Sequence, residues 1–183
     1  MANKNKIVEC GLVQAINVKD VVKVRLPFAV DGSVLTFHQG DQIVAETLEA
    51  GSRTIYAGAL VTDATTEEPV MIINQDVYKD EYGNKHGYVV NPAKITYKSG
   101  DLIMGLRPSK NIPFMLTYDA FSQDAAVGSY LVPQVANETD EETFNLVVSA
   151  TNTGAVGYKI TKIAEPVPVG QNIENAVLVR TIC

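Results

Sequence analysis

Apolar and polar side chains alternate along several short stretches of the chain. Val22, Val24 and Leu26 alternate with Lys23 and Arg25. The same two-residue repeat recurs in three further stretches, at 95–97, 144–148 and 158–160. This spacing places the apolar side chains on one face of a β-strand. No long segment shows the three-to-four spacing of an amphipathic helix, so the pattern predicts an all-β protein.

Turn signals separate these stretches every eight to twelve residues. Glycine recurs beside aspartate, serine or asparagine, as at Gly32, Gly40, Gly51 and Gly100. Such residues form the tight turns that join short strands. We therefore expect a sandwich or barrel-like fold of about twelve short strands with little helix. A short helix is expected near 116–123, or at 137–142 with Thr139 as its cap.

A boundary between two small β subdomains is expected near Pro92. The preceding segment, 78–87, is polar and rich in turn residues. This places an N-terminal β region with a basic arm at 1–92 and a C-terminal β region at 93–183. Two five-residue stretches, 39–43 and 99–103, resemble each other, since each has glycine–aspartate before an apolar strand.

The charge of the chain limits its partners. The 183 residues carry a net charge of −6 with a pI of about 4.9, which disfavours binding to nucleic acid. Residues 1–25 nevertheless carry a local excess of +3. This basic start is either a solvated strand face with a loose end or an arm that binds an acidic partner through Lys4 and Lys6. No apolar run is long enough to span a membrane, and we expect no membrane partner.

Residues suited to catalysis or metal binding are few and scattered. His38 lies in a strand-like stretch and His86 in a polar loop, and neither belongs to a recognised catalytic motif. Cys10 and Cys183 lack the spacing of a zinc site, and whether they pair stays open. We therefore expect no enzyme, no catalytic residue, no cofactor and no metal.

Three tyrosines gather in one polar segment. Tyr78, Tyr82 and Tyr88 surround the turn at Gly83 and form the best candidate for a small contact patch. A β-hairpin with ordinary tyrosine packing explains them equally well.

Several segments resemble small β-rich virion proteins of tailed bacteriophages. The residues that support this resemblance are a glycine–aspartate turn before a strand, an aspartate–alanine–phenylalanine segment, a valine–glycine–x–tyrosine–leucine–valine–proline strand and a lysine-bearing strand. They lie at 97–103, 117–121, 127–133 and 157–160, with a further strand at 143–148. The alanine–glycine–alanine–leucine–valine stretch at 57–61 is similar to a strand of head decoration proteins.

The resemblance implies a non-enzymatic structural protein that decorates or cements a phage capsid. It implies assembly in the bacterial cytoplasm, a place in the virion, and either the major capsid protein or copies of the chain itself as partners. A homo-oligomer on a symmetric shell is then expected. A receptor- or carbohydrate-binding β-sandwich of a phage tail and a tail-tube subunit stay open as alternatives.

Overall fold

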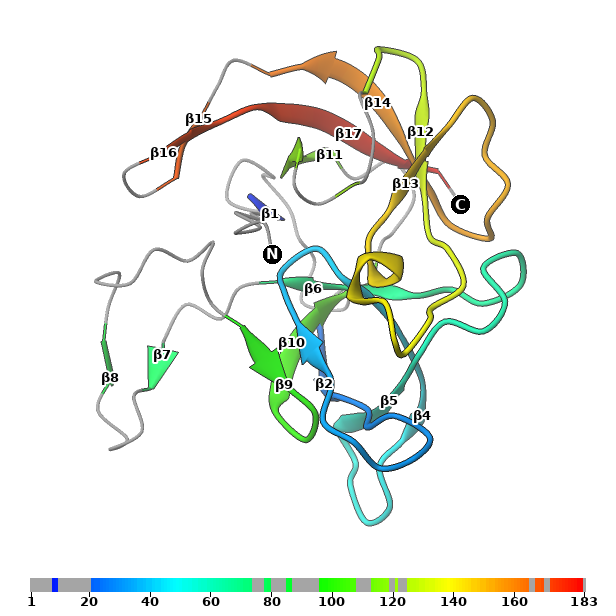
Figure 1. Cartoon of the computed structure of the whole chain (residues 1–183), viewed down its shortest axis with the longest axis vertical. Coiled ribbons are helices and arrows are strands. Elements are labelled where there is room, and N and C mark those ends of the chain that lie inside the picture. The colour runs from blue at the N-terminus through cyan, green and yellow to red at the C-terminus, as the bar shows by residue number, and fades with distance from the viewer. Residues whose placement is uncertain are drawn as a thin grey trace.

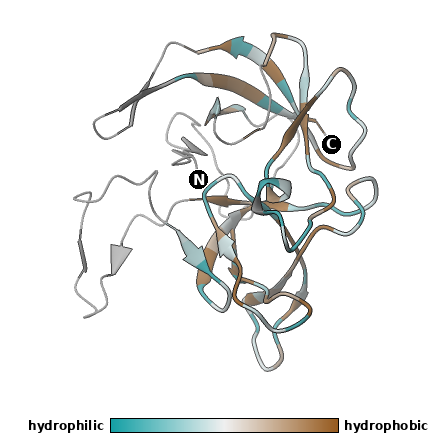
Figure 2. Ribbon diagram, viewed as in Figure 1, coloured by the Kyte–Doolittle hydropathy of each residue, from teal (hydrophilic) through white to brown (hydrophobic). Residues whose placement is uncertain are grey.

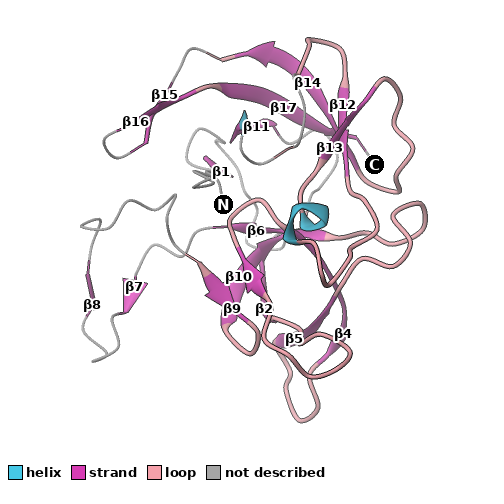
Figure 3. Cartoon of the chain, viewed as in Figure 1, coloured by secondary structure: helices cyan, strands magenta, loops and turns pink. Residues whose placement is uncertain are grey.

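The fold is all-β, as the alternation predicts. The computed structural model describes residues 8–9, 21–73, 78–79, 85–86, 96–107, 113–118, 121, 125–164, 167–169 and 172–182. In these ranges twelve strands have three or more residues, and five more have two. No helix among them reaches seven residues, and a 3-10 turn at Glu141–Phe144 supplies the short helix visible in Figure 3. None of the described helices is long and apolar enough to cross a membrane.

Five strands close into a barrel, in the lower half of Figure 1. Their order around the barrel is β10-β2-β5-β4-β6. The bounds are Val21–Arg25 for β2, Gln42–Leu48 for β4, Ile55–Ala59 for β5, Val70–Ile73 for β6 and Leu102–Leu106 for β10. Strands β2 and β5 run parallel, whereas the other neighbours are antiparallel. The barrel thus extends on both sides of the boundary expected near Pro92, which itself lies outside the described residues.

The barrel contains an internal repeat with approximate two-fold symmetry. One unit runs through β2, β3 (Thr36–Phe37) and β4, and the other through β6, β9 (Tyr97–Lys98) and β10. The first strand of each unit pairs with the last strand of the other, and β3 pairs with β9. Registers agree as well, because Ile43 opposes Val70 as Ile103 opposes Val24. All four side chains are buried.

The two glycine–aspartate stretches are the matching turns of this repeat. Gly40 and Gly100 have φ of 85° and 86°, a left-handed conformation that favours glycine. The following aspartates accept a hydrogen bond from the backbone N–H three residues earlier, from His38 to Asp41 Oδ2 and from Lys98 to Asp101 Oδ2, both at 2.7 Å. The similarity seen in the sequence therefore reflects a repeated piece of structure.

Each turn is also bonded to the other unit, at its first strand or at the residue that directly follows this strand. Gly40 N–H and Asp41 C=O bond the backbone of Ile72, both at 2.9 Å. Gly100 N–H and Asp101 C=O bond Leu26 in the same way, both at 3.0 Å.

A six-stranded antiparallel sheet lies beside the barrel, in the upper half of Figure 1. Its order is β1-β11-β17-β14-β12-β13. The bounds are Val8–Glu9 for β1, Pro113–Thr117 for β11, Tyr130–Val132 for β12, Val147–Ser149 for β13, Gly157–Ile163 for β14 and Ala176–Ile182 for β17. Two ribbons complete the described strands, β7 (Tyr78–Lys79) with β8 (Lys85–His86), and β15 (Val167–Val169) with β16 (Asn172–Glu174).

Strand β6 lies between two hydrophobic cores. Val70 and Ile72 pack in the barrel core, whereas Met71 and Ile73 pack against the six-stranded sheet. All four are buried, which is why this strand reads as a continuous apolar run and appears brown in Figure 2. The barrel and the sheet therefore share one wall.

Two local expectations differ from the structure. Residues 116 and 117 end strand β11, and Tyr118 follows as 3-10 helix, while most of the segment 119–123 lies outside the described residues. The short helix expected at 137–142 begins after Asp140 and not after Thr139, and the Asp140 carboxylate accepts the Glu142 N–H. Phe144 belongs to this helix and not to a strand. Its ring stacks on Phe37 with centroids 5.2 Å apart, which places it in the barrel core.

Candidate protein-contact surface

The connection between β2 and β3, residues 27–35, presents apolar side chains to solvent. Phe28 is 52% exposed, Val30 95% and Val34 59%. Isolated exposed apolar residues are common, but three within one short loop form a feature typical of contact sites. We call this segment the apolar loop.

Both ends of the apolar loop are fixed to the second glycine–aspartate turn. Leu26 exchanges two backbone hydrogen bonds with the turn, from its N–H to Asp101 C=O and from Gly100 N–H to its own C=O. Leu35 donates its N–H to Ser99 Oγ at 2.8 Å and accepts the Ser99 N–H at 3.1 Å. The loop therefore starts and ends on one rigid base.

The base also supports the aromatic ring of the loop. A Cβ on Gly100 would lie 3.3 Å from Phe28 Cζ, so the ring rests directly over the glycine. Arg25 strengthens the same corner, donating from Nη1 to Gly100 C=O at 3.0 Å and from Nε to Glu49 Oε1 at 2.7 Å.

The tip of the loop is a hydrogen-bonded turn. Ala29 donates its N–H to Ser33 C=O, and Gly32 donates to Ala29 C=O at 2.9 Å. Asp31 Oδ1 accepts the Ser33 N–H at 2.8 Å. Hydrogen bonds from the Ser33 hydroxyl and N–H lower the pKa of Asp31. Its carboxylate therefore stays charged at pH values below the usual pKa of an aspartate.

A carboxylate from a distant part of the chain binds the backbone of Val30, the most exposed apolar residue of the loop. Glu138 Oε1 accepts the Val30 N–H at 2.9 Å. Glu138 lies in the turn at 137–143, which also contains Asp140, Glu141 and Glu142. Asn137 Oδ1 accepts the Thr139 N–H at 3.1 Å and its hydroxyl at 2.9 Å, which fixes the start of this turn. We call residues 137–143 the acidic turn.

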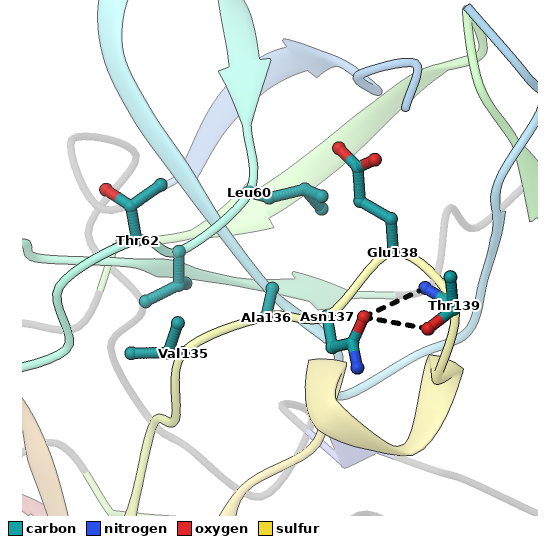
Figure 4. Close-up of a pocket in the computed structure, with 8 residues that line it drawn as sticks. Leu60, Thr62, Val135, Ala136, Asn137, Glu138 and Thr139 are labelled. Atoms are coloured by element: carbon teal, nitrogen blue, oxygen red, sulfur yellow. Dashed lines mark hydrogen bonds between the residues drawn. The ribbon is translucent and has the colours of Figure 1, made fainter. Parts of the chain in front are cut away.

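A shallow groove of about 410 Å³ borders the acidic turn. One wall comes from residues 60–62 after β5 and the other from residues 135–139, as Figure 4 shows. The walls are joined by a hydrogen bond from Ala136 N–H to Val61 C=O at 2.8 Å. Leu60 and Val135 are among the apolar residues that line the groove, and the bond from Val30 N–H to Glu138 links the groove to the apolar loop.

A second polar turn lies just after the groove wall. Asp63 accepts hydrogen bonds from the Thr65 N–H and hydroxyl and from the Thr66 hydroxyl, which lower its pKa. Partial burial alone would raise the pKa of Glu67. Bonds from the Thr62 hydroxyl and from the N–H groups of Asp63 and Thr62 outweigh this and lower it. The carboxylates of Asp63 and Glu67 therefore accept hydrogen bonds that stabilise this turn.

Most of the contact residues expected from sequence lie outside the described residues. This holds for Lys4, Lys6, Tyr82 and Tyr88, as it does for Cys10 and Cys183. Tyr78 begins β7 and pairs with His86 in β8. In chain order, the tyrosine segment occupies the same place between β6 and β9 as the apolar loop between β2 and β3.

His38 is close to a carboxylate but is part of the first glycine–aspartate turn. Its Nδ1 lies 3.9 Å from Asp41 Oδ2, and Asp41 is buried. Within the described ranges, no three His, Cys, Asp or Glu side chains come together as metal ligands would.

The apolar loop was not predicted from the sequence, because its first residues continue the pattern of a strand. The alternation of β2 continues past Leu26 to Phe28 and Val30, so the pattern looks like one longer strand. Pro27 was the available signal, because proline lacks the N–H that a central strand requires.

Comparisons with protein-family models, curated proteins and solved structures found no match to this chain.

Proposed function

We propose that this chain is a non-enzymatic virion structural protein that decorates or cements a bacteriophage capsid. The observation that supports this most is the apolar loop, whose exposed side chains stand on a hydrogen-bonded base. A rigid loop loses little conformational freedom on binding, so apolar contacts of modest size become effective. The resemblance of segments 57–61 and 97–160 to virion proteins supports the same role.

The partners on this proposal are the major capsid protein, further copies of the chain, or both. A symmetric shell repeats one weak contact many times, and such repetition raises the overall affinity without a deep pocket. The shallow groove and the exposed loop suit contacts of this kind.

The test is sedimentation of the purified full-length chain with empty capsids of the phage that encodes it. We expect the chain to sediment with capsids at a ratio that matches the symmetry of the shell. If the chain does not bind capsids but is retained on a glycan or cell-wall column, the result would favour a receptor- or carbohydrate-binding β-sandwich of a phage tail. Self-assembly into tubes would favour a tail-tube subunit. Either result would contradict the capsid role.

A further inference from the structure

We infer that the apolar loop and the acidic turn together form the docking surface, and that they fit an apolar recess rimmed by lysine or arginine side chains on the major capsid protein. This inference rests on the proposed function, since it names the chemistry of the partner at that site. Phe28, Val30 and Val34 would enter the recess, while Asp31 and Glu138 would face its basic rim.

The apolar part of the inference follows from exposure combined with fixed geometry. Val30 is the most exposed large apolar residue in the described chain, yet its N–H is held by Glu138. The tip and the base of the loop are hydrogen-bonded, and the Phe28 ring is supported by Gly100. Holding apolar side chains in water in one conformation costs stability, and a partner that buries them recovers the hydrophobic free energy.

The basic rim follows from the charges that flank the loop. Asp31 lies at its tip, Glu138 bonds its backbone, and Asp140 and Glu142 are exposed in the same acidic turn. These carboxylates favour lysine or arginine side chains on the partner surface, and the attraction between opposite charges speeds the encounter of the two proteins.

The apolar contact is tested by replacing Val30 and Val34 with serine in one variant. The matched control carries Val127→Ser and Ile163→Ser, two exposed apolar residues of the six-stranded sheet region. We expect capsid binding at least about tenfold weaker for the loop variant and unchanged for the control. Equal thermal unfolding of both variants will show that the loop change acts on binding.

The charge contact is tested with Asp31→Asn combined with Glu138→Gln. Both replacements keep a carbonyl oxygen that can accept the Ser33 and Val30 N–H bonds, so the loop should stay in place. We expect slower association at low salt and a smaller loss of rate when salt is raised. The control, Glu46→Gln with Glu68→Gln, removes the same charge elsewhere on the chain and should leave the rate unchanged.

The outcomes separate the two proposals. If the wild-type chain fails to bind capsids, the proposed function is wrong and the docking surface falls with it. If the wild-type chain binds and the loop variant binds equally well, the docking surface is wrong and the proposed function stands. If the loop variant loses binding but the charge variant behaves as its control does, the recess lacks the inferred basic rim.

Discussion

At the scale of single residues, Gly58 decides whether two strands of the barrel can come together. A Cβ at this position would lie 2.6 Å from Arg25 C=O, 3.1 Å from Pro27 Cδ and 3.2 Å from Val24 Cγ1. Strand β5 runs parallel to β2 here, with Ala57 opposite Arg25. The nearest obstacle is backbone, which cannot turn aside as a side chain can.

We therefore expect Gly58→Ala to lower the free energy of unfolding by about 3 kcal/mol, the upper part of the range for overpacked sites. Gly51→Ala is the control, because Gly51 has φ of 78° but open space around it. Its cost should be about 1 kcal/mol, from backbone strain alone. Urea unfolding of the two variants measures both values, and an equal cost would contradict the steric argument.

At the scale of elements, the two glycine–aspartate turns have the same geometry but different surroundings. Asp41 is 1% exposed and lies among buried Gln39 and Gln42, whereas Asp101 is exposed. Each carboxylate accepts one backbone N–H three residues back at 2.7 Å. Loss of a bond is more costly where water cannot replace it.

Asp41→Ala should therefore lower the free energy of unfolding by about 1.5–3 kcal/mol, and Asp101→Ala by about 1 kcal/mol. Urea denaturation of the two alanine variants gives the comparison. Asparagine at either position keeps an acceptor and should recover part of the loss. A larger effect at Asp101 would show that the base of the apolar loop, and not burial, determines the cost.

These turns also show how much the sequence could predict. Alternation identified β2 and β14, and the paired glycine–aspartate stretches were visible as a similarity. The alternation of apolar and polar residues within a strand does not tell which distant strand it pairs with. The pairing of each unit's first strand with the other unit's last strand was therefore not predictable. Nor could the alternation show that Leu26 and Leu35 both bond the turn at 99–101, which is what makes residues 27–35 a projecting loop.

At the scale of the whole molecule, the shared wall joins the barrel to the sheet. Neighbouring residues of β6 face opposite cores, and Leu106 of β10 also packs with the sheet while Ile103 packs in the barrel. The Tyr158 hydroxyl of β14 reaches Gln42 Oε1 of β4 at 3.5 Å. If β6 left its place, both hydrophobic cores would be exposed to water. The barrel and the sheet should therefore unfold as one unit.

Met71→Ala tests this coupling, since Met71 is fully buried and faces the sheet. The cavity should cost about 2–5 kcal/mol. Hydrogen exchange should quicken by a similar factor at Val24, in the barrel core, and at Ile160, in the sheet, because both amides then exchange through global unfolding. Val127→Ala, at an exposed site, should leave both unchanged. Faster exchange at Ile160 alone would mean that the sheet opens while the barrel stays folded.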